Sequence, residues 1–312
     1  MTEKCPCLSR FTLPQGLKSG QVIRKGYYFR SSDCKTIQRY YCRACRRGFS
    51  RATFSPAYWQ KKRFINPRVF HQLCSGTSIR RTAKILGIDR RTVARKLKFL
   101  AQLERSRSDR TILKALGNRP VSQVYFDEVE TSHHTKLKPL SIPLLVSPER
   151  VILGFDVAIM PAKGHLAALS RKKYGVRPDG RQKALKGVLK SVRPFLSSEV
   201  AFSSDECPRY PSVLKMLYPE APHCTTPGRR GAVVGQGELK KIGFDPLFAL
   251  NHTAAMLRAN VNRLFRKTWC TTKQIDRLKD HLTLYAAYHN RYLVLAHKPR
   301  LQPKLLTPGA DK

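Results

Sequence analysis

The chain has 312 residues, 41% of them hydrophobic, and its 60 Lys and Arg against 20 Asp and Glu give a formal net charge of +40. This composition argues against wholesale disorder and predicts a polyanionic partner, above all nucleic acid. The sequence contains no apolar run of about 18 residues and starts without an apolar leader, so we expect no membrane partner and no secretion.

Cysteines gather near the N-terminus. Cys42 and Cys45 have the C-x2-C spacing with which two thiolates hold one Zn²⁺, and Cys5 and Cys7 form a second pair upstream. The nine cysteines are odd in number and unevenly placed, which argues against a disulfide framework. A short β-rich segment has little core without such a metal. We therefore predict a structural zinc on these four residues, with Cys34 as an alternative ligand and ordinary reduced thiols as the simpler reading.

Three helices are predicted next. Pro67 suits a first helical turn, Ser78 is a candidate N-cap for a helix through Leu86, and a third helix covers Arg90–Glu104. The spacing is that of a helix-turn-helix, although a basic helix in a bundle has a similar pattern. The third helix would offer these side chains to DNA phosphates and guanine edges: Arg90, Arg91, Thr92, Arg95 and Lys96.

The remainder reads as an α+β or α/β body with a mixed sheet, because strands come first and helices later. Strands are expected at 121–129, 140–146, 151–159 and 199–204, and helices at 181–196, 210–217, 246–267 and 275–288.

Two acidic pairs follow apolar strands. Asp127-Glu128 closes one predicted strand and Asp205-Glu206 closes another. Two such carboxylates with a third ligand hold Mg²⁺ ions for phosphoryl transfer, although an acidic residue at a strand end more often caps the following helix.

A basic helix is predicted farther along, between residues 246 and 267. It would carry Arg258, Arg263, Arg266 and Lys267 and would bring DNA phosphates to the acidic site. An amphipathic surface helix is the simpler reading.

This order of features resembles the transposases of the insertion-sequence-one family. The resemblance covers roughly residues 5–290 and rests on Gln38–Cys45, Arg80–Gly87, Asp127-Glu128, Asp205 followed by Tyr210, and Leu257-Arg258 followed by Arg263–Thr268. It implies a multidomain fold: an N-terminal β zinc ribbon (1–55), an all-α helix-turn-helix domain (62–107), an α/β ribonuclease-H-like catalytic core (118–292) and a loosely ordered tail (293–312).

One position departs from the family. Its catalytic Glu aligns with Asn251, which offers an oxygen to Mg²⁺ but no charge. Asp245 and Glu238 are nearby alternatives for the third ligand.

The resemblance implies an enzyme that binds the terminal inverted repeats of a mobile element and cuts and joins double-stranded DNA with Mg²⁺ or Mn²⁺. Asp127, Asp205 and Asn251 would form the catalytic set, in a homo-oligomer associated with the prokaryotic nucleoid in the cytoplasm. The alternative is a sequence-specific DNA-binding protein derived from a transposase, with a lapsed catalytic core.

Overall fold

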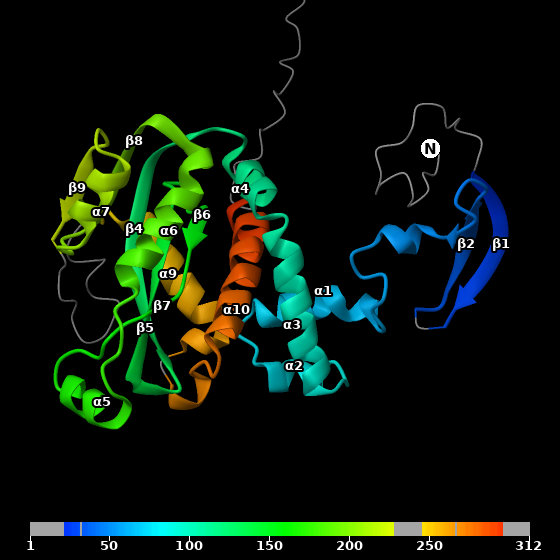
Figure 1. Cartoon of the computed structure of the whole chain (residues 1–312), viewed down its shortest axis with the longest axis horizontal. Helices are drawn as coiled ribbons and strands as arrows, with labels where there is room; N and C mark the ends of the chain where they lie inside the picture. Colours follow the sequence, from blue (N-terminus) through cyan, green and yellow to red (C-terminus); the bar gives the residue numbers. More distant parts are fainter. Residues whose placement is uncertain (1–21, 32, 228–244, 266, 296–312) are drawn as a thin grey trace, which may run out of the picture. The chain divides into compact units, whose positions relative to one another are not determined.

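The computed structural model describes residues 22–31, 33–227, 245–265 and 267–295 (Figure 1). The chain divides into two compact units, residues 1–68 and 69–312. Cys5, Cys7, Glu238 and Arg266 lie outside the described residues. No helix in the described part of the chain is long and apolar enough to cross a bilayer.

The first unit is built on a small antiparallel sheet, in the order β1-β2-β3. Its core is Tyr40, Cys42 and Phe49, with Tyr40 and Phe49 stacked. The pairing of β1 with β2 shifts by one residue between Arg24 and Tyr27, where Gly26 adopts a φ of 63°. The elements of this unit are β1 (Val22–Arg30), β2 (Lys35–Cys42), β3 (Gly48–Phe49) and the 3-10 turns η2 (Arg51–Phe54) and η3 (Arg63–Ile65).

Three helices follow where the sequence predicts them, and a fourth, α4 (Ser108–Leu116), comes after them without having been predicted. The Ser78 hydroxyl accepts a hydrogen bond from the Arg81 N–H, which confirms Ser78 as an N-cap, and Asp89 caps the next helix through the Arg91 N–H. Gly87, at a φ of 60°, lies between the two helices. The helices are α1 (Asn66–Leu73), α2 (Ile79–Ile85), α3 (Arg90–Arg105) and α4 (Ser108–Leu116).

From Val69 onward these helices belong to the same compact unit as the large sheet. Helix α10 (Ile275–Tyr288) packs against α3, and His281 on α10 contacts the carbonyl oxygen of Leu73 at 2.7 Å. The N–H of Gly76 donates to the carbonyl oxygen of Asn260 at 2.7 Å. Residues 69–107 are thus joined to the body at several points along the chain.

The large sheet is mixed, as predicted. Its path is β6-β5-β4-β8-β9, with β7 paired to β5; the first three strands are antiparallel, and β4, β8 and β9 run parallel. The strands are β4 (Val121–His133), β5 (Thr135–Val146), β6 (Ile152–Phe155), β7 (Ala158–Ile159), β8 (Leu196–Asp205) and β9 (His223–Thr226).

Helices pack on this sheet around a core that contains Phe126, Phe202 and Leu189. Helix α6 packs closely on β6 at Gly154. A Cβ added at this position would lie only 2.8 Å from the side chains of Val188 and Val192, so the absence of a side chain permits the close approach. Helix α9 packs against β4 and β5. The remaining elements are α5 (Leu166–Tyr174), α6 (Arg181–Val192), η4 (Arg193–Phe195), α7 (Tyr210–Leu217), α9 (Phe248–Asn260), η5 (Asn262–Leu264), η6 (Thr268–Cys270) and the π-helix η7 (His289–Val294).

Several predicted boundaries are wrong; strand β5, for example, begins at Thr135 rather than at 140. Strand β4 does not end near Val129 but continues to His133, because its second half pairs with β5 as a hairpin. The predicted helix 246–267 ends at Asn260. The predicted strand 151–159 is divided into β6 and β7. The chain also remains packed through η7, where the Asn290 amide bonds both backbone groups of Ile152 at 2.9 Å.

Candidate active site

Asp127 and Asp205 lie on neighbouring parallel strands. The register of β4 on β8 pairs Tyr125 with Ser203; continued by two residues on each strand, it sets Asp127 level with Asp205, whose charge contributes to the raised pKa of Asp127. Neighbouring strands are about 4.8 Å apart, so the side chains of two residues at the same level on these strands are neighbours on the sheet. Asp205 is the last residue of β8, as predicted, whereas Asp127 lies in the middle of β4.

The Asp127 carboxyl has an unusual proton affinity. Burial raises its pKa to about 6, and the nearby charge of Asp205 adds to the increase. The Glu128 N–H (2.6 Å) and the Tyr210 hydroxyl (3.4 Å) both donate to Oδ1 and act in the opposite direction. Tyr210 is itself buried at the start of α7.

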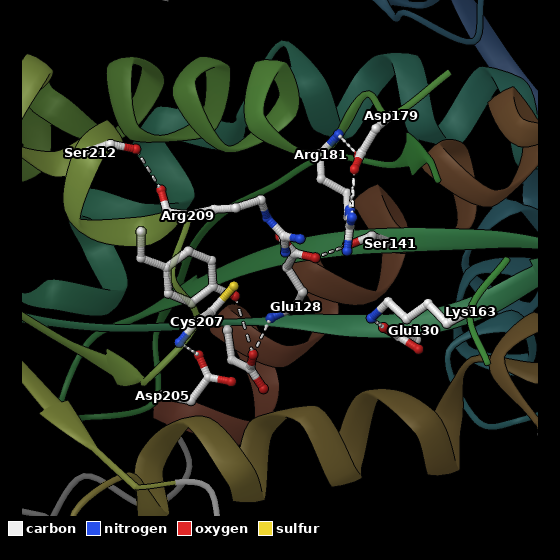
Figure 2. Close-up of polar contacts among 12 residues, drawn as sticks. Glu128, Glu130, Ser141, Lys163, Asp179, Arg181, Asp205, Cys207, Arg209 and Ser212 are labelled. Atoms are coloured by element: carbon white, nitrogen blue, oxygen red, sulfur yellow. Dashed lines mark hydrogen bonds and ion pairs between the residues drawn. The ribbon is translucent and has the colours of Figure 1, made fainter. Parts of the chain in front are cut away.

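Asp205 is held by the turn that follows its strand. Its Oδ1 accepts a hydrogen bond from the Cys207 N–H at 3.2 Å, and the chain then enters α7. In Figure 2, α9 passes below Asp205. Within the described part of the chain, Oδ2 of Asp127 and Oδ2 of Asp205 accept no hydrogen bond from the protein, so each has an oxygen that can bind a ligand.

Glu128 has a different role from its neighbour. Adjacent side chains of a strand point to opposite faces, and Glu128 is engaged by Arg209 at 2.9 Å and by the Ser141 hydroxyl at 2.8 Å (Figure 2). Its side chain is only 8% exposed. This link between β4, β5 and the residue before α7 was not predicted; the only sequence signal is an Arg directly before Tyr210.

Asn251, the predicted third metal ligand, is hydrogen-bonded to Asp245. Asn251, exposed on α9, donates its amide N–H to Oδ2 of Asp245 at 2.9 Å, while Oδ1 of Asp245 accepts from the Leu247 N–H. Among the described residues, no three His, Cys, Asp or Glu side chains gather as metal ligands. Asp127, Asp205 and Asp245 therefore do not form a preassembled carboxylate triad.

The acidic pair nevertheless fits a hard divalent cation. It presents two carboxylates with available oxygens, and a cation between them would offset the repulsion that helps to raise the pKa of Asp127. Mg²⁺ is commonly bound by one or two carboxylates, with water and substrate phosphate completing its shell. The residues present therefore suit Mg²⁺ or Mn²⁺ bound together with a phosphate substrate.

The raised pKa predicts a stabilising substitution. A carboxyl whose pKa rises on folding, from about 4 to about 6, penalises the folded state increasingly as pH rises across that interval, and the penalty is constant above it. Without divalent cations, Asp127→Asn should raise the free energy of unfolding by roughly 1–3 kcal/mol at pH 8 and by little at pH 4. Urea unfolding at both pH values measures this, with Glu149→Gln, in an exposed turn, as the control. An equal gain at both pH values would contradict the assignment.

The predicted recognition residues begin α3. Arg90, Arg91 and Arg95 are exposed and Thr92 is half-buried. Lys96 does not share their surface: it is only 5% exposed, and burial lowers its pKa. Lys96 lies on the helix face that also buries Val93 and Leu97, so its expected role in DNA contact is wrong.

The second predicted basic set is not on one helix. Arg258 is on α9, but Arg263 and Lys267 come after the helix has ended. Arg263 is half-buried, donates to the Thr272 hydroxyl at 3.4 Å and has a pKa lowered by burial, so it does not present its charge to solvent as predicted. Lys267 is exposed and lies over the Trp269 ring.

The cysteine knuckle forms a tight turn. Cys42 ends β2, Cys45 packs against the same small core, and the Cys42 N–H donates to the carbonyl oxygen of Arg47 at 3.0 Å. Cys34 precedes β2 at its opposite end, roughly 25 Å away at about 3.3 Å per residue, so it cannot bind the same ion. The described pair suits Zn²⁺, and its predicted partners, Cys5 and Cys7, lie outside the described residues.

Comparison with known proteins adds no relative: no family model matches the chain, and no curated protein matches it. The resemblance to insertion-sequence-one transposases therefore depends on the residues named above.

Proposed function

We propose that this protein is a DNA transposase that cuts and joins the ends of a mobile element with Mg²⁺ or Mn²⁺. The observation that carries the proposal is the register of β4 on β8, which brings Asp127 and Asp205 together although 77 residues separate them in the chain. The mixed sheet supports the ribonuclease-H-like core that the resemblance implies.

In this proposal each residue near the pair has a defined task. Asp127 and Asp205 hold the cations, which when bound would stabilise the charge that develops on the reacting phosphate. The Glu128 N–H and Tyr210 hydroxyl fix Oδ1 of Asp127. Arg209, through Glu128, holds the start of α7 and so the turn that orients Asp205.

Asn251 would complete the metal shell through its amide oxygen. Two Mg²⁺ ions carry four positive charges, and two carboxylates offset only two, so substrate phosphate must supply negative charge. Asn251→Glu should therefore retain or raise DNA cleavage at low Mg²⁺, even though it replaces the hydrogen bond to Asp245 with repulsion. Cleavage is measured as a function of Mg²⁺ concentration, with Asn251→Gln as the neutral control of equal length.

If Asn251→Glu and Asn251→Gln behave alike while Asp245→Ala is inactive, Asp245 is the third ligand and the alignment of α9 with the family is incorrect.

The first unit would be a zinc ribbon. We expect one Zn²⁺ per chain in the purified protein, and Cys42→Ser should remove it and unfold this unit, because structural zinc supplies folding free energy directly. Cys34→Ser is the matched control, since Cys34 lies at the far end of β2. Zinc is measured by elemental analysis and folding by circular dichroism. Equal zinc in wild type and Cys42→Ser would contradict the site.

DNA ends would be read by the helix-turn-helix formed by α2 and α3. Arg90, Arg91 and Arg95 remain exposed for this role, and a homo-oligomer would pair two ends. The protein would act in the cytoplasm of a prokaryotic cell, associated with the nucleoid.

The deciding experiment is a Mg²⁺-dependent cleavage assay of wild type on DNA that carries the inverted repeats flanking its gene. The uncharged Asn251 at the position of the family's catalytic Glu favours a second candidate, a DNA-binding protein with a lapsed core. That candidate is supported if wild type binds the repeats without cutting them and Asn251→Glu cuts them.

A further inference from the structure

The first unit exposes an unusual number of aromatic side chains. Of the fifteen large hydrophobic residues exposed in the described part of the chain, seven lie between residues 27 and 64. Tyr27 is 65% exposed, and Phe29, Trp59 and Phe64 are also open to solvent. Exposed apolar groups on this scale mark an interaction surface.

Two of these rings line a groove within the unit. Its volume is about 1180 Å³, and it lies between the β1–β2 sheet and the segment 51–67. Tyr27 lines it from the sheet and Phe64 from the segment, together with Arg24, Lys35 and Arg51. The groove thus combines aromatic faces with positive charge.

The bulge in β1 sets the direction of Tyr27. Before it, Arg24 pairs with Tyr40; after it, Tyr27 pairs with Gln38. Without the extra residue, Tyr28 rather than Tyr27 would occupy the face that carries Gln38 and Tyr40, because a shift of one residue exchanges the two faces of a strand. The Gln38 amide donates to the Gly26 carbonyl at 2.8 Å and secures the bulge.

The charge of the unit selects the kind of partner. Residues 22–68 contain thirteen Lys and Arg and one acidic residue, Asp33, so their net charge is 13 − 1 = +12. Asp33 is already paired with Arg30 and lies 3.8 Å from Arg63. Two copies of so basic a surface repel each other, whereas a polyanion is attracted.

We propose that this groove binds unpaired, single-stranded nucleic acid. Bases stack on Tyr27 and Phe64, and phosphates lie against Arg24, Lys35 and Arg51. Stacking of bases on aromatic side chains between basic residues is how proteins hold single strands without sequence preference. A duplex keeps its base faces covered, so the groove favours the single strand. The proposal is independent of the catalytic function proposed above.

The test measures binding of the full chain to a labelled dT15 oligonucleotide and to a 15-base-pair duplex by fluorescence anisotropy. We expect Tyr27→Ala and Phe64→Ala each to weaken binding to dT15 about tenfold, with little effect on the duplex. Tyr27→Phe keeps the ring and should bind dT15 like wild type. Val176→Ala, which removes an exposed apolar side chain from the second unit, should change neither affinity.

A second measurement does not depend on variants. Photocrosslinking of a 5-bromouracil strand to wild type, followed by peptide mapping, should place the crosslink at Tyr27 or Phe64. The proposal is wrong if the double variant that combines Tyr27→Ala and Phe64→Ala binds dT15 like wild type, or if crosslinks fall only on the second unit. It is also wrong if the double variant loses binding to phosphatidylserine vesicles while keeping dT15, since the groove would then be a membrane site.

Discussion

Asp205→Ala is expected to abolish strand cleavage, with a fall of at least about 10³-fold, because the variant loses one of the two charges that hold the cations stabilising the reacting phosphate. Asp205 is the final residue of β8. Cleavage of end-labelled repeat DNA, resolved on denaturing gels, gives the rate. Binding of the same DNA should be unchanged in the absence of Mg²⁺.

Glu206→Ala is the matched control. Glu206 is the next residue and is exposed, so it shares the local sequence and charge of Asp205 without its position beside Asp127. We expect Glu206→Ala to cleave like wild type. If Asp205→Ala cleaves like wild type while remaining folded, the acidic pair is not the catalytic site and the proposed function fails with it.

Asp280→Ala is expected to destabilise the second unit strongly. The Asp280 side chain is 4% exposed on α10; it accepts a hydrogen bond from Arg105 of α3 at 2.5 Å and forms an ion pair with Arg277 at 2.6 Å. The charge of Arg263 is also close. Removing the carboxylate leaves these guanidinium groups facing one another with no anion, at a cost of about 3–5 kcal/mol.

Calorimetry of the full chain measures this loss as a lower Tm of the second unit's transition. Asp276→Ala, an exposed Asp in the first turn of the same helix, is the control and should cost about 1 kcal/mol or less. Hydrogen exchange at the C-terminal end of α3 should rise in Asp280→Ala only. An unchanged Tm would show that the ion pairs with Asp280 contribute little to the packing of α3 on α10.

Local signals explain which parts of the fold were predictable. Ser78 caps α2 through a side-chain bond three residues away, and α7 spans the predicted residues 210–217, so a short window of sequence contains the information. Which strand pairs with which is not contained in a short window of sequence. The order of strands and helices along the chain is nevertheless enough to predict a mixed sheet. Asp127 and Asp205 were singled out because each follows apolar strand residues, the resemblance added to that reading, and the register of β4 on β8 then explained their proximity.

The misplaced residues depend on distant contacts. Lys96 lies five positions after the exposed Arg91, and the packing of α3 buries the side that carries Lys96 together with Val93 and Leu97. Arg263 turns inward because the chain leaves helical geometry at Val261, between Asn260 and Asn262. Arg105 and Asp280 are 175 positions apart, and Arg209 and Glu128 are 81 apart. No periodicity in the sequence relates such pairs.

The anchoring of α3 at one end has a consequence for how this protein can vary. Glu104 bonds Arg291 of η7 at 2.6 Å and Arg105 bonds Asp280, so the last turn of the helix is fixed to the body while Arg91 and Arg95 extend from its first turns. Each residue inserted between them would rotate the exposed arginines by about 100° around the helix axis. The number of residues in α3 therefore sets the direction in which the exposed arginines point relative to the body. Insertions of seven residues, close to two full turns, would nearly preserve it, whereas one or two would turn the arginines toward the body.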